Sequence, residues 1–423
     1  MKEREAQPAS LSERGRVLVL GEDTRIVLPI VRSLGRRGME VHLAWCPRDE
    51  PVMRSRYLHA AHMLAPYRTR DDAWLNELAS LLDRERFDLI IPATEAALVP
   101  IQQARGKLSD AGRFTLLNQR SFECFFDKGK TQALARSLGV PSPRGAILDK
   151  HDRLAEAVAG WTFPLAVKPL GSVDPENISG KRFVRRADDV GQLSACLALL
   201  ADHEQVVVEE WFTGRGFGVE FLAQEGEVLF AFQHERLHET IGYGSTYRRS
   251  VPLDPRLLDA AKRLLQEVQY TGVGMAEFRC DPSSGKFVLL EVNARFWGSL
   301  PLAAAAGADF PAYLCELLMD GRRLFPQAYR TNVRCRNLLN DVRWMWRALS
   351  GRANADMTVA DFDGWQMNSV SRGQVAVDLV RMLLAVDRTD TFSWKDPAPA
   401  LAELIALAGN TCRRFTRGSS RAI

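Results

Sequence analysis

The chain has 423 residues, 46% of them hydrophobic, which is enough for several domains with apolar cores. Its 56 basic and 52 acidic side chains leave a formal net charge of only +4, a balance that argues against nucleic acid as the main partner. The seven cysteines form no CxxC pair, which favours reduced thiols over disulfides or structural zinc. The sequence shows no signal-peptide pattern and no run of about eighteen apolar residues, so we expect a soluble, cytoplasmic protein.

The first 118 residues have the pattern of an open α/β domain with a parallel sheet, in which apolar strands alternate with amphipathic helices. The expected elements are strands at 17–20, 41–45 and 88–92 and helices at 25–37 and 74–84. Only Gly21 stands in the first turn, so the pattern is not that of a dinucleotide site. Glu22, Thr94 and Glu95 follow strand ends and are candidates for touching a small substrate, with capping and turn roles as the alternative.

The middle of the chain places two lysines next to structured elements. Lys128 lies at the start of a helix that runs to about residue 138, and Lys168 lies near the end of an apolar strand at 163–169. A buried strand does not carry a lysine without an anionic partner. The following loop, 171–180, is polar with glycines at both ends, so its N–H groups could fold over phosphates, although a plain flexible connection remains the alternative.

Residues 274–298 predict a β-hairpin with a polar face. If the hairpin is symmetric about Ser284, Glu277 and Glu291 lie opposite one another, and Asn293 and Arg295 share their face. Two carboxylates this close repel one another unless a cation lies between them, and oxygen ligands suit Mg²⁺. Arg295 would then suit a phosphate oxygen. The alternative is an edge hairpin with a solvated face.

Other segments gave weaker signals. His234 and His238 are four residues apart, but no third ligand follows at a suitable spacing, so we reject a metal site there. Arg236 is a candidate clamp for a substrate carboxylate, with a surface salt bridge as the alternative. Helices are expected at 337–349, 375–386 and 397–407, where they could cap a cleft, form an oligomer contact or pack on the outside, and a basic tail follows.

The order of these features resembles the ATP-grasp superfamily over residues 15–320, most closely the side with carbamoyl-phosphate synthetase, biotin carboxylase and uncharacterised carboxylate-amine ligases. The resemblance rests on two lysines, a glycine-containing loop, the strand at 205–212 and the motif Glu291-Val292-Asn293-Ala294-Arg295. It implies a multidomain α/β and α+β chain with an ATP-grasp fold, preceded by a Rossmann-like parallel-sheet domain. The expected domains are 1–118, 119–215 with the lid, 216–325 with the hairpin, and a mostly helical extension at 326–423.

The resemblance also implies roles for individual residues. ATP phosphates would meet Lys128 and Lys168 and the lid residues Ser172 and Gly180, while adenine would bind beside Glu209, Glu210 and Phe212. One or two Mg²⁺ ions, or Mn²⁺, would be held by the metal ligands Glu277, Glu291 and Asn293. Arg295 would steady the transferring phosphoryl group and Arg236 the acceptor carboxylate. The sequence Gly214-Arg215-Gly216 lacks the family's ribose-binding acid, for which Glu220 could substitute, unless its role is structural.

The implied activity is that of a ligase, which activates a carboxylate as an acyl phosphate and couples it to an amine, releasing ADP and phosphate. The partners would be small carboxylates and amines, with no nucleic acid or membrane and possibly a second copy in a homodimer. A phosphotransferase with the same fold and a non-catalytic ATP-binding regulator are the alternatives.

Overall fold

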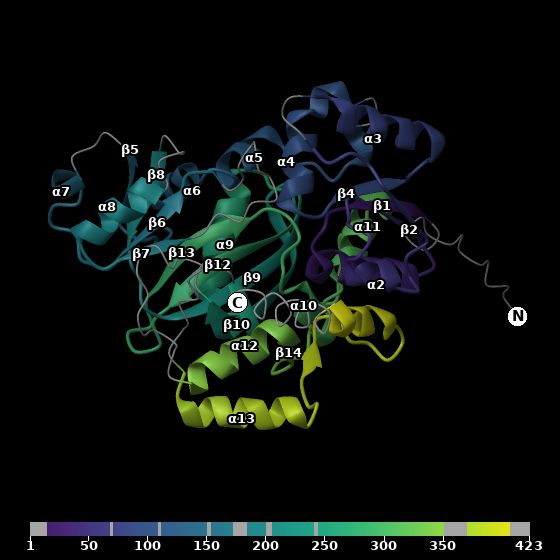
Figure 1. Cartoon of the computed structure of the whole chain (residues 1–423). Coiled ribbons are helices and arrows are strands. Elements are labelled where there is room, and N and C mark those ends of the chain that lie inside the picture. Colours follow the sequence, from purple (N-terminus) through teal and green to yellow (C-terminus); the bar gives the residue numbers. More distant parts are fainter. Residues whose placement is uncertain are drawn as a thin grey trace, which may run out of the picture. The chain divides into compact units, whose positions relative to one another are not determined.

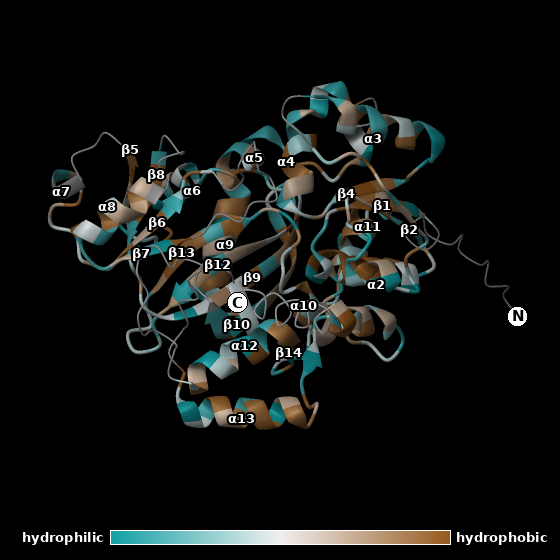
Figure 2. Cartoon of the chain, viewed as in Figure 1, coloured by the Kyte–Doolittle hydropathy of each residue, from teal (hydrophilic) through white to brown (hydrophobic). Residues whose placement is uncertain are grey.

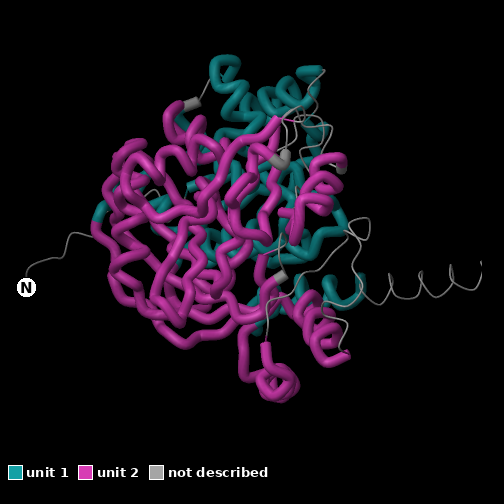
Figure 3. The backbone as a smooth tube through the Cα atoms, turned by 90° about the vertical axis from the view of Figure 1, so that its left-hand side faces the viewer, with its two compact units in different colours: residues 1–116, 309–323, 389–423 teal, residues 117–308, 324–388 magenta. Residues whose placement is uncertain are grey.

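The computed structural model describes residues 15–67, 71–108, 111–149, 154–171, 184–199, 205–240, 244–350 and 370–406 (Figure 1). Two compact units are present, as Figure 3 shows. Unit 1 comprises residues 1–116, 309–323 and 389–423, and unit 2 comprises residues 117–308 and 324–388. This division differs from the four consecutive domains expected from the sequence, because the C-terminal residues are shared between the two units rather than forming a block of their own.

Unit 1 contains a four-stranded sheet in the order β3 (Ala60–His62), β2 (Glu40–Ala44), β1 (Arg16–Leu20), β4 (Leu89–Pro92). All three pairings are parallel, which confirms the expected open α/β domain. Strands β1 and β4 are almost wholly apolar and buried, as strands covered on both faces must be (Figure 2). The helices of unit 1 are α2 (Thr24–Arg36), α3 (Ala73–Arg84), α4 (Glu95–Gln103) and α11 (Phe310–Asp320), with short 3₁₀ turns at Pro51–Arg54, Arg105–Lys107 and Ala111–Arg113.

A buried ion pair fastens the C-terminal segment within unit 1. Arg32 on α2 donates from Nε to Asp396 Oδ2 at 2.8 Å and from Nη2 to the carbonyl oxygens of Thr391 and Asp396. Ser55 Oγ and the Arg56 N–H also donate to the Asp396 carboxylate. Because Asp396 is almost fully buried, these donors are what compensate its lost hydration. Residues 398–406 are helical.

Unit 2 contains two antiparallel sheets. The smaller has the order β5 (Gly145–Asp149), β8 (Gln205–Glu210), β6 (Leu165–Pro169), β7 (Arg185–Ala187), with helices α7 (Leu154–Ala157) and α8 (Val190–Leu199). The larger has the order β13 (Phe287–Asn293), β12 (Gly272–Cys280), β9 (Arg215–Gln224), β10 (Glu227–Thr240), β11 (Gly244–Val251), β14 (Arg334–Arg336), β15 (Arg388–Thr389). The remaining helices before residue 308 are α5 (Gln119–Phe125), α6 (Lys128–Ser137), α9 (Pro255–Glu267) and α10 (Leu300–Ala306).

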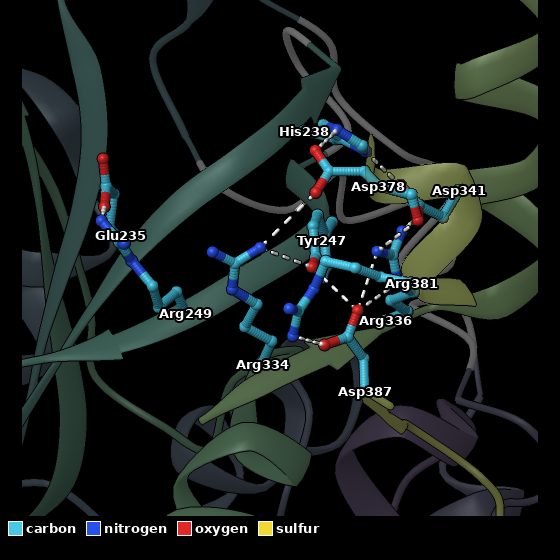
Figure 4. A network of polar contacts seen from close by, with 10 residues as sticks. All are labelled: Glu235, His238, Tyr247, Arg249, Arg334, Arg336, Asp341, Asp378, Arg381 and Asp387. Carbon is cyan, nitrogen blue, oxygen red and sulfur yellow. Dashed lines mark hydrogen bonds and ion pairs between the residues drawn. The ribbon is translucent and has the colours of Figure 1, made fainter. Parts of the chain in front are cut away.

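Helices α12 (Leu338–Leu349) and α13 (Arg372–Leu383) confirm two of the helices expected beyond residue 326. A network of buried charges ties them to β10, β11 and β14 (Figure 4). His238 stacks on Trp344 and bonds to Asp341 through Nδ1 (2.7 Å) and to Asp378 through Nε2 (3.3 Å). Burial alone would lower the pKa of His238, but the two carboxylates outweigh it and raise that pKa.

Arg336 completes this network, because its guanidinium reaches Asp341 at 2.5 Å, Asp387 at 2.8 Å and the carbonyl oxygen of Asp378. It also stacks over the Tyr247 ring at 3.5 Å. The basic tail expected after Arg413 lies outside the described residues. Within the described part of the chain, no single helix is long and apolar enough to cross a membrane, although consecutive helices α10 and α11 would together reach that length and composition.

Replacing Asp341 by asparagine tests the network. Asp341 is fully buried and accepts hydrogen bonds from His238, Thr246 and Arg336, so the variant removes one of the two anions that each buried cation contacts. We expect a loss of about 3–5 kcal/mol in the free energy of unfolding, measured by urea unfolding followed through tryptophan fluorescence. The control Asp259→Asn, at an exposed position, should change that value by less than about 0.5 kcal/mol. Equal effects of the two variants would contradict the role given to the network.

Candidate functional site

The predicted hairpin is present as β12 and β13, and its register places Glu277 directly opposite Glu291 and Met275 opposite Asn293. The opposed carboxylates predicted from symmetry about Ser284 are therefore confirmed. β13 contains a bulge at Leu290. Glu277 pairs with Glu291 and the next residue, Phe278, pairs with Leu289, so Leu290 has no partner on β12. Such a bulge next to a functional pair changes the direction of the side chains that precede it on the strand.

Donors from within the sheet offset the repulsion between the two carboxylates. Asn293 Nδ2 donates to Glu277 Oε1 at 3.1 Å and to Glu291 Oε1 at 3.3 Å. Arg236 on β10 pairs with Glu277 Oε2 at 2.6 Å. The amide and the guanidinium thus occupy the positions next to the carboxylates where a cation would be most strongly attracted. Three oxygen-bearing side chains that converge in this way have the donor chemistry of a Mg²⁺ site.

The two carboxyl groups differ in their titration because the cations are unevenly placed. Burial raises the pKa of Glu277, and the nearby Glu291 adds to that shift, against the opposing effect of Arg236. Burial would also raise the pKa of Glu291, but Lys128, Lys168, Arg295 and Arg236 outweigh it and lower that pKa. Glu291 therefore loses its proton at a lower pH than Glu277 does. Lys128, Lys168, Arg295 and Arg236 are thus close enough to Glu291 for their charges to act on its carboxyl group.

Both lysines are positioned by the end of β6. Lys168 Nζ lies 2.5 Å from Glu209 Oε2, and both side chains are buried between the neighbouring strands β6 and β8. This supplies the anionic partner that a buried strand lysine requires. Lys128 begins α6, where the Asp127 side chain caps the helix and the Lys128 N–H donates to Leu170 O at 3.1 Å. Glu209 therefore holds Lys168 through its side chain, a contact that the sequence did not indicate.

The predicted adenine segment lies at the end of β8. The Glu210 N–H donates to Arg144 O at 2.8 Å, and the Glu210 carboxylate accepts from the Thr162 N–H at 3.0 Å. Phe212 follows the strand and is half-buried. Of the lid residues, Ser172 and Gly180 both lie outside the described residues.

Arg236 reaches Glu277 by crossing over β9, the strand between them in the sheet. Glycines make the crossing possible, because a Cβ on Gly216 would lie 2.7 Å from Arg236 Cδ and 2.5 Å from Glu239 Oε1. Gly218, two residues along, leaves room for the His234 ring in the same way. Alternate glycines in a strand signal this kind of close approach. The sequence reasoning treated Gly214-Arg215-Gly216 only as a departure from a ribose motif and so missed it.

The crossing also shows that Arg236 is not a surface salt bridge. Its guanidinium is largely buried and pairs with Glu239 at 3.2 Å as well as with Glu277, and its Nε has no hydrogen-bond partner among the described residues. Glu239 in turn binds Arg279 at 3.0 Å. Arg279 and Glu239 are thus two further charged residues beside the site that sequence reasoning did not single out, although Arg279 shares a strand face with Glu277.

Glu220 lies within the sheet rather than at its surface. It is fully buried and bonds to His234 Nδ1 at 2.5 Å and to Ser299 Oγ at 3.5 Å. Burial raises the pKa of Glu220 well above its usual value and lowers that of His234 to about 3, so the His234 ring is neutral near pH 7. These contacts favour the structural role and argue against a ribose contact. They also agree with rejecting a metal site at His234 and His238.

The candidate substrate residues of the first domain have local partners. Thr94 is the residue before α4, Glu95 lies in the first turn of that helix, and Thr94 Oγ1 donates to Glu22 Oε2 at 3.4 Å. Burial raises the pKa of Glu22. These contacts agree with the alternative of capping and turn roles.

The fold and the site have the arrangement expected of an ATP-grasp protein. The larger antiparallel sheet carries the β12–β13 hairpin with Glu277, Glu291 and Asn293. The smaller sheet supplies Lys168 on β6 and the half-buried segment at the end of β8. Residues 202–340 match the model of a family described as "ATP-grasp in the biosynthetic pathway with Ter operon". The match covers about a third of the chain and identifies residues 202–340 as an ATP-grasp region.

Comparisons with individual proteins agree. The chain is 30% identical over 211 residues to D-alanine–D-alanine ligase of Ectopseudomonas mendocina, a match that covers 46% of this chain and 64% of that protein. N5-carboxyaminoimidazole synthetase from Staphylococcus aureus, solved with ADP, superposes with a TM-score of 0.62 at 13% identity over 86% of this chain and 96% of that one. The L-amino acid ligase from Bacillus licheniformis gives 0.55 at 18% identity over 72% and 74%. The two structures share the fold.

The substitution Glu291→Gln tests the metal and phosphate site. It keeps the size of the side chain but removes the charge that four cations surround, so we expect Mg²⁺-dependent ATP binding to weaken about tenfold or more. Titration calorimetry with a non-hydrolysable ATP analogue, with and without Mg²⁺, measures this change. The exposed control Glu123→Gln should bind as the unchanged protein does. Unaltered binding in Glu291→Gln would exclude this residue from the site.

Proposed function

We propose that the protein is an ATP-dependent ligase that joins a carboxylate to an amine. The observation that carries the proposal is the opposed Glu277–Glu291 pair, which Asn293 and Arg236 contact directly. The charges of Lys128, Lys168 and Arg295 act on Glu291 in addition. Two relatives named above are amino-acid ligases, which supports the reaction class. The amine acceptor and the carboxylate are small molecules, and ATP with Mg²⁺ or Mn²⁺ is the co-substrate.

The chemistry requires ATP because a carboxylate has no usable leaving group. Its oxygen attacks the γ-phosphorus, the bond from that phosphorus to the bridging oxygen of ADP breaks, and an acyl phosphate forms. The amine nitrogen then attacks the acyl carbon, phosphate leaves, and the amine loses a proton to give the amide. Each step moves negative charge among phosphate oxygens, so positioned cations stabilise the transition states.

The chain's own side chains divide this work. Lys128 and Lys168 bind phosphate oxygens, with Lys168 held in place by Glu209, and Arg295 steadies the phosphoryl group in transfer. Glu277, Glu291 and Asn293 would hold Mg²⁺, Asn293 by turning its amide oxygen inward; the ion supplies charge neutralisation at bridging phosphate oxygens. Adenine would bond to the Glu210 carbonyl and the Phe212 N–H, because the Glu210 N–H already bonds to Arg144.

Arg236 binds the carboxylate to be activated. It already spans the sheet to Glu277, and its buried Nε has no hydrogen-bond partner among the described residues. We also propose a cytoplasmic protein, on the free thiols of the six described cysteines, Cys46, Cys124, Cys196, Cys280, Cys315 and Cys335.

The test is ADP and phosphate release from Mg-ATP with pools of carboxylic acids, each with and without pools of amino acids and amines, followed by mass spectrometry. We expect release that requires both pools and a product whose mass is the sum of acid and amine less one water. Lys168→Ala should abolish release while the protein stays folded. Release with an acid alone and a stable phosphorylated product would instead identify a phosphotransferase, and binding without turnover in any pool would support a regulator.

Two variants test the role of Arg236. Arg236→Ala should raise the KM for the acid about tenfold or more while changing ATP affinity much less, because the guanidinium contacts the substrate carboxylate. Gly216→Ala should have the same effect, since its Cβ would displace the Arg236 side chain. Gly106→Ala, where a Cβ meets nothing within 4 Å, is the control. Equal losses of acid use and ATP affinity would contradict the proposal that Arg236 binds the substrate carboxylate.

A further inference from the structure

Three of the seven histidines lie together at the β2–β3 edge of the unit 1 sheet, and no step of the proposed reaction uses them. His42 is on β2, His62 is on β3, and His59 directly precedes β3. The His42 ring stacks on both of the others, with ring centroids 5.1 Å apart in each case. Phe87 packs its edge against His42 and His62.

His42 has a ring nitrogen without a partner. The side chain is only 3% exposed, its Nδ1 lies 2.8 Å from His62 Nε2, and its Nε2 has no hydrogen-bond partner among the described residues. Burial and the neighbouring histidines lower the pKa of His42 to about 4, so the ring is neutral near pH 7. If Nδ1–H donates to His62, a buried lone pair remains on Nε2, which is the form of imidazole that binds metals.

Two further donors lie beside the His42 ring. Glu40, His42 and His59 each offer one ligand atom, and these atoms lie within 4.8 Å of one another. Glu40 is two residues before His42 on the same strand, so both side chains share a face. Arg16 holds Glu40 through Oε2 at 2.9 Å, which orients the carboxylate. His59 is exposed, so this side chain can turn to bring the ligand atoms to the spacing of about 3.4 Å found around a tetrahedral ion.

We propose that Glu40, His42 and His59 form a binding site for a divalent transition-metal ion of the Zn²⁺ type. His42 binds through Nε2, and His62 accepts the other ring proton and so fixes the tautomer, as outer partners of metal-bound histidines do. Two imidazoles with one carboxylate suit Zn²⁺ better than Mg²⁺, which prefers oxygen ligands. Water completes the coordination on the side of His59. The ion joins β2 to the residue before β3 and stabilises this edge of the sheet.

The test is calorimetric titration of the full chain with Zn²⁺ in millimolar Mg²⁺, so that the oxygen ligands of the hairpin are not the ones titrated. We expect the unchanged protein to bind Zn²⁺ and His59→Gln to bind it at least tenfold more weakly. His59 is exposed, so that variant keeps its fold. Glu85→Gln is the matched control, because Glu85 pairs with Arg16 but is not a ligand, and it should keep the affinity.

X-ray absorption at the zinc edge identifies the ligands directly, and we expect two imidazoles per bound ion in the unchanged protein and fewer in His59→Gln. Absence of Zn²⁺ binding, equal affinity in His59→Gln, or a first shell made of oxygen alone would each overturn the proposal. None of these measurements uses ATP or turnover, so the outcome is independent of the proposed ligase activity.

Discussion

Two carboxylates that face each other across a hairpin impose the main constraint on unit 2. At the distance between paired strands, Glu277 and Glu291 repel one another, and partial burial strengthens the repulsion. The structure offsets it with cations from four separate places in the sequence, namely Lys128, Lys168, Arg236 and Arg295. Charges from α6, the end of β6, β10 and the segment after β13 therefore act on one carboxylate, and a bound metal nucleotide would meet a site whose charges are already in place.

The same principle recurs at the far end of the larger sheet, where the paired charges fix the position of helices instead of serving chemistry. His238, Arg336, Asp341, Asp378 and Asp387 are buried and mutually paired, and together they hold α12 and α13 on β10, β11 and β14. Buried ion pairs of this kind specify one arrangement more than they add stability, because each charge tolerates few alternative partners. β10 links the two regions, since it carries both Arg236 and His238.

The hairpin was readable from the sequence because its turn residues and alternating strands act over short distances, and the parallel strands of unit 1 were readable from their continuous apolar runs. The path of Arg236 was not, because it depends on which strand lies between β10 and β12, and sheet order is set by tertiary packing. Gly216 and Gly218 indicate a strand that other side chains cross, but this can be concluded only once β9 is known to lie between β10 and β12. Likewise, nothing local to Asp396 indicates that its partner is Arg32. The lid residues Ser172 and Gly180 remain predictions.

The pairing of Arg32 with Asp396 has a consequence for how the protein is made. The two residues are 364 positions apart, so at about 5–20 residues per second a ribosome needs roughly 20–70 s after Arg32 to supply its partner. During that interval residues 117–308 of unit 2 are complete, while the parallel sheet of unit 1 still lacks the segment that neutralises its buried arginine. Unit 1 is thus the last part of the molecule to reach its final form, although its sheet is the first to be synthesised. A chain that stops early would have the Arg32 side chain unpaired on an apolar helix face, and we expect such a chain to be degraded.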